Sequence, residues 1–394
     1  MRRLRVCVAT TVFPRRLGDG EGPFIWQFVK VLRQQQIDVT VVAMHSPGLP
    51  TRDNWEGVEI LRPPYWWPVG AEMLRKDGGG LPINFRRYPL ARAQLPALLA
   101  AHGAAIGRAA KGCDLIHAHF TVSAAAALAM RAWHHLPVVT TVHGSDVFQV
   151  PKLPLGTKFT RSVLRQSAAV TTVSTALCDA CRALDVPPSK VSVISNSVDT
   201  TAYAPPAEQT MVGREPLVLF VGSLITRKGV DTLVRAMAQV VATLPGYRLV
   251  VVGEGPEQAT LADLAASLGI AAQVEFVGFL PQVDVARWMK RARLFVLPSN
   301  EEGQGVVVLE AMASGTPVVA SNVGGIPEVV VAGTGLLAPP GDSKALAAQI
   351  LALLGDAGYW QQVSLAGRNH VEQHYSPRVI GACYRDLYAG MLGR

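Results

Sequence analysis

The sequence predicts an α/β protein of two domains, each built on a doubly wound parallel sheet. Short valine-rich runs alternate with longer segments of helical spacing along most of the chain, which is the pattern of repeated βαβ units. At 394 residues the chain is longer than one typical core can accommodate. With 49% apolar and 17% charged residues, it has the composition of a folded protein.

In the first domain, apolar runs predict the strands and helical spacing predicts the helices between them. The expected strands are residues 4–10, 38–43, 115–118, 137–142, 168–173 and 191–194, and the expected helices are 24–35 and 123–132. Residues 45–95 show the least regular pattern. Within them, Arg62-Pro63-Pro64-Tyr65-Trp66-Trp67-Pro68 predicts a loop whose aromatic rings either form a contact surface or pack beneath the chain.

The second domain repeats the βα rhythm after a linker. Pro205-Pro206 and the polar residues up to Glu215 predict this linker, so that the domains comprise residues 1–204 and 205–375. The expected strands are residues 217–221, 249–253, 274–277, 294–297 and 335–338. Helices are expected from residue 230, over 306–313, from 343 and after Pro377; Gly315 and Pro317 end the helix over 306–313.

Two features of the first domain lie where parallel sheets bind ligands, after the carboxyl ends of strands. The loop over residues 13–23 is rich in glycine, and Gly22 stands directly before a helix, where backbone N–H groups can approach a phosphate. His143-Gly144 follows the strand over 137–142. A histidine at such a strand end is more often a ligand-contacting residue than one in the middle of a helix.

Adjacent cations, Arg227 and Lys228, stand in the loop between the first strand and the first helix of the second domain. The guanidinium fork and the ammonium point charge suit a diphosphate held at a helix N-terminus. An exposed basic pair without a ligand is the alternative.

Two carboxylates, Glu302 and Glu310, stand eight residues apart around the start of the helix over 306–313. Eight helical residues span roughly 12 Å, too far for the two groups to share one proton. They could instead hold the two ends of an elongated ligand, with the N–H groups of Gln304, Gly305 and Val306 binding phosphates between them. A nucleotide sugar has this form. The alternative is an acidic helix start that complements the helix dipole, with Glu310 in solvent.

These residues belong to a pattern that resembles a known family. Glu302 and Glu310, followed by Ala-Met-Ala-Ser-Gly-Thr-Pro-Val-Val-Ala and by Gly324-Gly325-Ile326-Pro327-Glu328, are similar to the Glu-x7-Glu signature of retaining glycosyltransferases of family 4. The glycine loop, His143-Gly144, Asn196-Ser197-Val198-Asp199 and the cation loop occur in the family's order. The resemblance implies the GT-B fold: two Rossmann-like domains facing a central cleft, with a final helix over about 376–394 returning to the first domain.

The resemblance also implies an activity. The protein would transfer a sugar of the hexosyl type from an NDP-sugar, with UDP-sugar favoured, to a hydroxyl of a glycan or lipid-linked acceptor in cell-surface polysaccharide or glycolipid synthesis. The reaction would retain the anomeric configuration and need no metal and no cofactor. The alternatives are a GT-B sugar-nucleotide epimerase or phosphorylase, and a non-catalytic protein that binds nucleotide sugars.

The resemblance, together with the charge and helix-terminus arguments above, assigns a role to each candidate residue. Catalytic roles fall to His143, Glu302, Arg227 and Lys228, where Glu302 holds sugar hydroxyls, His143 lines the sugar and the cations stabilise the departing phosphate. Substrate-binding roles fall to Gly22, Gly278, Phe279, Leu280, Gln304, Gly305, Val306 and Glu310, the last at the ribose. Two positions depart from the pattern. Ser223 stands where arginine is expected, so that either Arg227 supplies the second cation or the diphosphate is held more weakly, and Thr121-Val122-Ser123 replaces a Pro-Asp-Gly.

Charge and cysteine content predict the surroundings. Residues 1–200 carry 23 Lys and Arg against 13 Asp and Glu, whereas residues 201–394 carry 14 against 16. The basic first half is expected to face an anionic membrane surface or a phosphate-bearing acceptor, unless it is simply a soluble basic surface. No nucleic-acid motif is present. Five scattered cysteines and the lack of an 18-residue apolar run predict a cytoplasmic protein, with a peripheral position on the inner face of the membrane as the further expectation.

Overall fold

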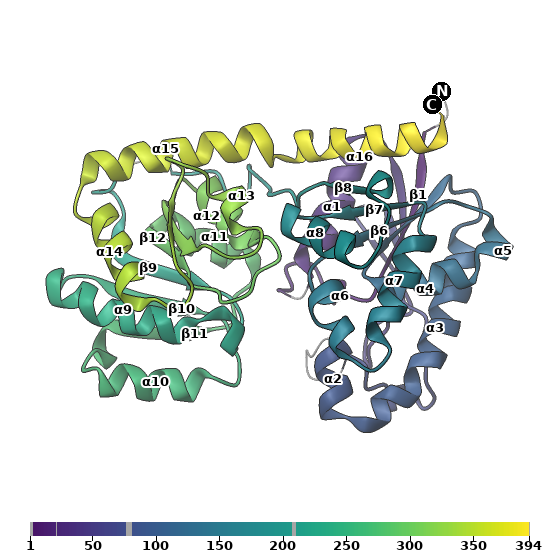
Figure 1. The fold of residues 1–394 in the computed structure, drawn as a ribbon, viewed down its shortest axis with the longest axis horizontal. Helices are drawn as coiled ribbons and strands as arrows, with labels where there is room; N and C mark the ends of the chain where they lie inside the picture. The colour runs from purple at the N-terminus through teal and green to yellow at the C-terminus, as the bar shows by residue number, and fades with distance from the viewer. Residues whose placement is uncertain (1–2, 21, 76–80, 207–209, 394) are drawn as a thin grey trace. The chain divides into compact units, whose positions relative to one another are not determined.

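The computed structural model describes residues 3–20, 22–75, 81–206 and 210–393 and divides the chain into two compact units (Figure 1). The N-terminal unit comprises residues 1–195 and 381–394, and the C-terminal unit comprises residues 196–380. The sequence places the boundaries at 204/205 and 375/376 instead. Residues 196–204 fall in the C-terminal unit because Asn196 hydrogen-bonds Gln304 and Tyr203 is buried in that unit's core.

The end of the expected linker is anchored in the C-terminal unit. Arg214 is only 3% exposed and precedes β9. Its guanidinium donates hydrogen bonds to the carbonyls of Met289, Ala292, Ser314 and Gly315 and to the hydroxyl of Thr316. Both terminal nitrogens of this buried guanidinium are thus hydrogen-bonded, which fixes the start of the C-terminal sheet. Residues 207–209 of the expected linker lie outside the described part of the chain.

The N-terminal unit alternates strands and helices. Its strands are β1 (Arg5–Thr10), β2 (Asp38–Ala43), β3 (Arg52–Trp55), β4 (Val58–Leu61), β5 (Leu115–His119), β6 (Val138–Val142), β7 (Ala169–Thr172) and β8 (Val191–Val193). Its helices are α1 (Pro23–Gln34), α2 (Leu81–Arg87), α3 (Pro89–Ala109), α4 (Thr121–Ala129), α5 (Arg131–His134), α6 (Ser145–Phe148), α7 (Gly156–Gln166) and α8 (Thr175–Ala183), and most of α16 (Pro377–Leu392) belongs to the same unit.

The strands form an eight-stranded sheet in the order β3-β4-β2-β1-β5-β6-β7-β8. All described pairs are parallel except β3 with β4, which is a correction to the expected parallel sheet. This hairpin lies in the stretch for which the sequence pattern is least regular. Glu56 and Gly57 both have positive φ, and the side chain of Asn54 accepts a hydrogen bond from the N–H of Gly57. A two-residue turn of this kind joins antiparallel strands.

The C-terminal unit has the same alternating order. Its strands are β9 (Glu215–Val221), β10 (Arg248–Val252), β11 (Val274–Gly278), β12 (Ala292–Leu297), β13 (Val318–Ser321) and β14 (Leu336–Ala338). Its helices are α9 (Val230–Thr243), α10 (Gln258–Ser267), α11 (Gln282–Arg291), α12 (Val306–Ala313), α13 (Ile326–Val329), α14 (Ser343–Leu354) and α15 (Ala357–His374). The sheet is parallel, with the order β11-β10-β9-β12-β13-β14.

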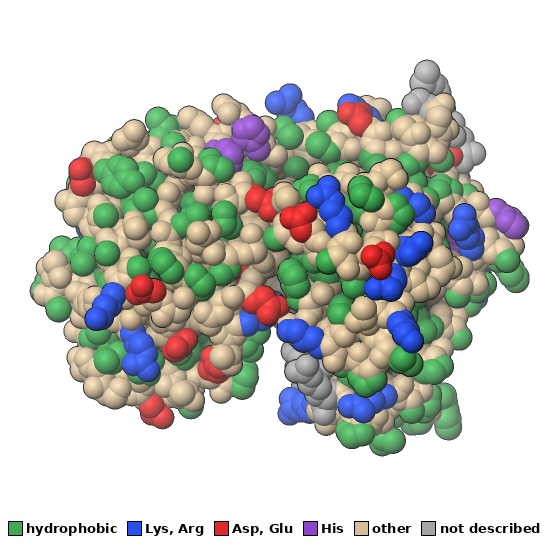
Figure 2. Space-filling model, in the orientation of Figure 1, with side chains coloured by type: hydrophobic (Ala, Val, Ile, Leu, Met, Phe, Trp, Pro, Cys, Tyr) green, Lys and Arg blue, Asp and Glu red, His purple; other side chains and the backbone are tan. Residues whose placement is uncertain are grey.

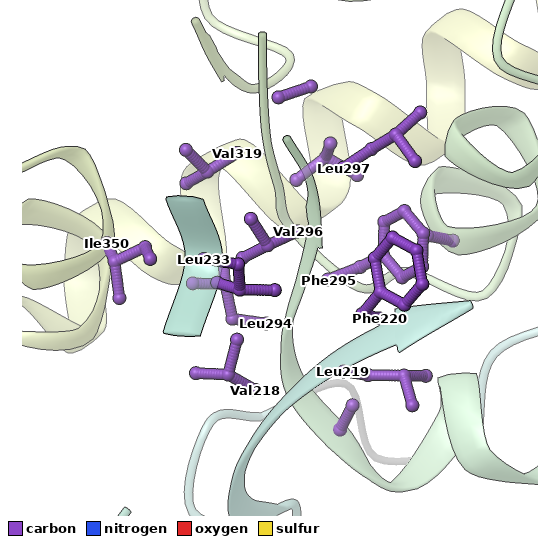
Figure 3. Packing of buried hydrophobic residues seen from close by; sticks show 14 of the residues in the cluster. Val218, Leu219, Phe220, Leu233, Leu294, Phe295, Val296, Leu297, Val319 and Ile350 are labelled. Atoms are coloured by element: carbon purple, nitrogen blue, oxygen red, sulfur yellow. The ribbon is translucent and has the colours of Figure 1, made fainter. Parts of the chain in front are cut away.

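Apolar side chains project from both faces of this sheet and pack against the helices that cover it. In Figure 3, Val218, Leu294 and Val296 point toward Leu233 of α9 and Ile350 of α14, whereas Phe295 points to the opposite side. All of these residues are fully buried. Burial on both faces explains why the strands read as continuous apolar runs in the sequence.

The sequence predicts some of the regular elements closely, whereas α2 and α3 form where it predicts no helix. The expected helix over 306–313 and the expected strand over 38–43 have the bounds of α12 and β2. Within the described residues, no helix is both long and apolar enough to cross a lipid bilayer.

Candidate active site

The predicted residues of the C-terminal unit lie on loops at one edge of its sheet. Arg227 and Lys228 follow β9, Gly278 ends β11, and Glu302 follows β12. These strands and β10 are parallel and adjacent in the order β11-β10-β9-β12, so the loops after them share the carboxyl edge. This edge brings together residues that are far apart in the sequence.

Backbone contacts lock the loops after β9 and β12 together. The N–H of Asn300 donates to the carbonyl of Arg227 at 2.8 Å, and its side-chain amide donates to the carbonyl of Thr226 at 3.1 Å. Gly229 has a φ of +62°, and a Cβ there would lie 2.2 Å from the carbonyl oxygen of Pro298. Only glycine permits this approach, which places Lys228 beside the loop that carries Glu302.

Lys228 and Glu302 form an ion pair. The Nζ of Lys228 lies 2.5 Å from Oε2 of Glu302, and the two side chains are 15% and 13% exposed. The hydroxyl of Ser299 and the backbone N–H of Gly303 also donate to the Glu302 carboxylate. The sequence analysis gives Lys228 a role at the diphosphate and Glu302 a role at the sugar of one ligand. In the structure the two side chains are in direct contact.

Electrostatics keep the Glu302 carboxyl ionised. Burial opposes ionisation, but the charge and hydrogen bond of Lys228, with a contribution from Arg227, lower the pKa of Glu302 below its ordinary value. Arg227 itself is exposed at the surface. The site therefore presents a carboxylate that is paired with Lys228 and stabilised further by the charge of Arg227.

The N-terminus of α12 begins beside this pair. Gly305 caps the helix with a φ of +83°, and the first N–H groups of a helix have no intrahelical acceptor. The side chain of Gln304 is buried, and its Oε1 accepts hydrogen bonds from the backbone and side chain of Asn196. Gln304 thus ties the loop to the start of the C-terminal unit, while the N–H groups of Gly305 and Val306 lie in the first turn.

Glu310 lies inside the unit and is only 7% exposed. Burial raises the pKa of its carboxyl to about 7, although the side chains of Tyr203 and Gln282 partly offset the effect. Near neutral pH the group is therefore divided between the protonated and ionised forms. The solvated Glu310 that the sequence leaves open as an alternative is wrong.

Gly278, Phe279 and Leu280 form the turn after β11. Gly278 has a φ of +79°, and its carbonyl accepts a hydrogen bond from the N–H of Gly253. The N–H of Phe279 lies 3.3 Å from Oε1 of Glu254, and its ring is 46% exposed. Leu280 packs against the core.

His143 stands at the carboxyl edge of the N-terminal sheet, after β6. Its Nε2 lies 2.9 Å from Nδ1 of His119, which ends β5, and the two rings stack with centroids 5.2 Å apart. His117 stacks on His119 and hydrogen-bonds Tyr388 of α16 and Thr141. Burial lowers the pKa of all three histidines, so they are neutral imidazoles at pH 7.

Asp146 holds the loops after β5 and β6 together. One carboxylate oxygen accepts from the N–H and the hydroxyl of Thr121, and the other accepts from the N–H of His143 at 3.0 Å. Gly22 lies in the same unit and caps α1 with a φ of +69°, where a Cβ would lie 2.8 Å from Val12. The left-handed backbone and the close Val12 side chain therefore both favour glycine at this position.

Sequence reasoning missed several residues of these sites. They are Tyr203, Gln282 and Glu254 in the C-terminal unit and Phe24, Phe120, Asp146 and Tyr388 in the N-terminal unit. Asn196 is named in the sequence only as part of a motif, without its contact to Gln304. Asp146 follows His143-Gly144 directly after a strand, so its position alone could have marked it. The other contacts depend on partners far away in the sequence.

Comparison with known proteins agrees with the geometry. Residues 206–370 match the family described as "Glycosyl transferases group 1", and residues 19–202 match "Glycosyltransferase Family 4". The chain belongs to glycosyltransferase family 4, as the resemblance in its motifs predicts, and it is a glycosyltransferase.

Two relatives illustrate this membership. Over 284 residues the chain is 31% identical to a glycogen synthase of Mycobacterium tuberculosis, a match that covers 70% of this chain and 68% of the relative. It is 30% identical over 289 residues to the N-acetyl-alpha-D-glucosaminyl L-malate synthase of Bacillus anthracis, covering 71% and 75%.

Solved structures confirm the GT-B fold. Sucrose-phosphate synthase from Thermosynechococcus elongatus superposes with a TM-score of 0.80 at 24% identity, covering 99% of this chain and 100% of that one. The Anabaena protein HepE, in complex with UDP-glucose, gives a TM-score of 0.76 at 19% identity, covering 98% and 100%.

Proposed function

We propose that this glycosyltransferase moves a hexosyl group from an NDP-sugar to a hydroxyl of a glycan or lipid-linked acceptor, with retention of the anomeric configuration and without a metal. The observation that carries the proposal is the Lys228–Glu302 pair beside the N-terminus of α12. A fixed carboxylate suits sugar hydroxyls, and cations beside helix N–H groups suit a diphosphate.

In the proposed reaction, the bond between the anomeric carbon and the β-phosphate oxygen breaks, and its electron pair leaves with the phosphate. The acceptor oxygen bonds to the anomeric carbon on the same face, and its proton passes to the departing phosphate oxygen. Negative charge grows on that phosphate, so Lys228, Arg227 and the N–H groups of Gly305 and Val306 stabilise the transition state more than the ground state. The ammonium of Lys228 has three donors and can bond Glu302 and a phosphate together.

The remaining residues complete the donor site in this proposal. Glu302 holds the sugar hydroxyls, and Glu310 holds the ribose. In its neutral form, the Glu310 carboxyl can also donate a hydrogen bond to a ribose hydroxyl. The exposed ring of Phe279 and the backbone of Gly278 contact the base. In the N-terminal unit, the neutral His143 lines the sugar and Gly22 approaches the diphosphate.

UDP is our favoured nucleotide, and an anionic or lipid-linked molecule is our favoured acceptor. HepE binds UDP-glucose with a similar fold. On the face drawn in Figure 2, Lys and Arg side chains gather over the N-terminal unit. Of the aromatic loop, Tyr65 is buried, but Trp67 is 86% exposed and available for contact with an acceptor or a membrane surface.

The test is a thermal-shift screen of UDP-, GDP- and ADP-sugars, followed by assays of NDP release with and without candidate acceptors. A ligand that binds the folded state raises the unfolding temperature. We expect one nucleotide to give the largest shift and NDP release to accelerate when an acceptor is added. Consumption of the donor without an acceptor, with formation of an epimer, would indicate an epimerase. A reaction that depends on phosphate and a glucan would indicate a phosphorylase. Binding without any release would indicate a sensor.

A further inference from the structure

Phe120 has an unusual backbone conformation at the site of His143. Its φ is 70° and its ψ is 146°, at the margin of a region that essentially only glycine occupies. Two other non-glycine residues with positive φ, His135 and Leu155, have ψ near 0° and lie in the milder left-handed helical region. Phe120 is thus strained in a way that these two residues are not.

Phe120 also breaks the capping rule of the helix that it precedes. It is the N-cap of α4, and no side chain caps this helix. Serine, threonine, aspartate, asparagine or glycine would serve the helix better, and glycine would also relieve the backbone. A residue that violates two local rules at once points to a requirement other than folding.

That requirement is visible in the contacts of three successive residues, His119, Phe120 and Thr121. His119 hydrogen-bonds the His143 imidazole, and the ring of Phe120 lies against the same imidazole with centroids 4.8 Å apart. The N–H of Thr121 donates at 2.7 Å to Asp146, whose other oxygen accepts from the N–H of His143. All three residues act on His143.

An ordinary strand exit could not make these contacts, because successive side chains point to opposite faces of a sheet. Phe120 still pairs with β6 through its N–H, which donates to the carbonyl of Thr141. Directly afterwards, the positive φ turns the chain so that the rings of both residues 119 and 120 reach His143. The ring of Phe24 also lies against the His143 imidazole, with the ring centroids 4.9 Å apart.

We propose that Phe120 is a positioning residue for His143, held in a strained backbone so that residues 119–121 clamp the imidazole at the sugar. This inference rests on the proposed function for the role of His143. The clamp engages the Nε2 of His143 through His119 and packs the ring of Phe120 against the imidazole. The backbone strain at Phe120 is the cost of fixing the imidazole.

The experiment compares Phe120→Ala with Phe120→Gly in the full-length protein. Both variants lose the ring, so we expect kcat to fall between about tenfold and a hundredfold in each, as for a displaced catalytic group. The KM for the NDP-sugar and the thermal shift given by NDP should stay within about twofold of the parent. Because only glycine relieves the backbone, Phe120→Gly should unfold at a higher urea concentration than Phe120→Ala, against the usual order of the two residues.

Leu155→Gly is the matched control. Leu155 also has positive φ, is 75% exposed and precedes α7 in the same unit. Relief of its backbone should leave kcat unchanged. Parental kcat in both Phe120 variants, or Phe120→Ala more resistant to urea than Phe120→Gly, would overturn the proposal.

A readout that needs no turnover separates this proposal from the proposed function. The imidazole NMR signals of His143, assigned with His143→Gln, should broaden or move in Phe120→Ala and stay unchanged in Leu155→Gly. Signals that are identical in the parent and Phe120→Ala would refute the clamp. If the parent transfers no sugar while the signals move as expected, the clamp stands and the role at the sugar is refuted.

Discussion

The ammonium of Lys228 and the carboxylate of Glu302 depend on each other because both are largely withdrawn from water. Removal of one partner of such a pair leaves the other charge without compensation. Without Lys228, burial would dominate and raise the pKa of Glu302, so the carboxyl would tend to become neutral. Substitution of Lys228 thus changes both the phosphate site and the sugar site.

Lys228→Ala should abolish the thermal shift given by UDP or the preferred NDP and lower kcat/KM at least a hundredfold, since a buried charge that stabilises the leaving group is lost. Differential scanning fluorimetry and a coupled NDP-release assay measure these effects. Lys344→Ala, on the exposed start of α14, is the control and should resemble the parent. A full NDP shift in Lys228→Ala would show that Lys228 does not bind the diphosphate.

Glu302→Gln separates the two parts of the donor. Lys228 remains, so the shift from NDP should persist, whereas the extra shift from NDP-sugar over NDP should shrink because the sugar hydroxyls lose a charged acceptor. Isothermal titration with both ligands gives the same comparison as affinities. Equal losses for NDP and NDP-sugar would argue against a role of Glu302 at the sugar.

Because of Glu310, the free energy of unfolding of the C-terminal unit should fall as the pH rises. The pKa of its carboxyl in the folded state, about 7, exceeds the ordinary value of 4.5, so between these values the unfolded chain ionises while the folded state keeps its proton. Unfolding therefore becomes easier as pH rises from 4.5 to 7, by about 3 kcal/mol in total, and the loss is complete above pH 7. Glu310→Gln should remove most of this slope in urea unfolding at pH 5 and pH 8. Asp263→Asn, exposed on α10, should keep it; an unchanged slope in Glu310→Gln would contradict the buried carboxyl.

At the scale of elements, α12 and the loops around it can be predicted from the sequence. The residues that their side chains contact elsewhere in the unit cannot. The apolar run of β12, the glycine at position 305 and the Gly315-Thr316-Pro317 stop fix the strand, loop and helix locally. The contacts of Gln304 with Asn196 and of Glu310 with Tyr203 join residues more than a hundred positions apart. Periodicity carries no information about such pairs.

The antiparallel β3–β4 hairpin shows a second limit. Residues 52–61 lack the long apolar run of a buried strand because they form the edge of the sheet, and the turn signal is only Glu56-Gly57. The sequence reveals the glycine loop, the cation loop and the Glu-x7-Glu motif because characteristic residues mark the ends of strands and the starts of helices. A buried network such as His117, Thr141 and Tyr388 leaves no such mark.

The close approach of the loops after β9 and β12 can be tested at Gly229. Gly229→Ala would place a Cβ 2.2 Å from the Pro298 carbonyl, so we expect the free energy of unfolding to drop by more than about 2 kcal/mol and NDP binding to weaken with it. Gly333→Ala is the control, because Gly333 has a φ of +83° but open space around its Cα. It should cost only about 1 to 2 kcal/mol for the left-handed backbone. Equal losses at the two positions, measured by urea unfolding, would contradict the contact.

At the scale of the whole molecule, the end of the chain is a structural part of its first half. Residues 381–394 belong to the N-terminal unit. Tyr384 packs edge-on against Phe28 of α1, and Tyr388 hydrogen-bonds His117 of β5. The N-terminal unit is therefore complete only when the last helix has been made.

Truncation after Ile380 should consequently lower the stability of the N-terminal unit and spare the C-terminal unit. Calorimetry should show one unfolding transition at a lower temperature, while the preferred NDP still raises the temperature of the other. Tyr388→Phe, which removes only the hydroxyl, should shift the same transition in the same direction by a smaller amount. Loss of the NDP response on truncation would mean that the two units do not behave separately.

The most direct test of the account is to follow by proton NMR the sugar that the protein first releases or transfers from its preferred NDP-α-sugar. Retention with the diphosphate bound at Lys228 predicts an α-anomeric product in the parent protein and its near absence in Lys228→Ala. A β-anomeric first product, or an unchanged rate in Lys228→Ala, would contradict it.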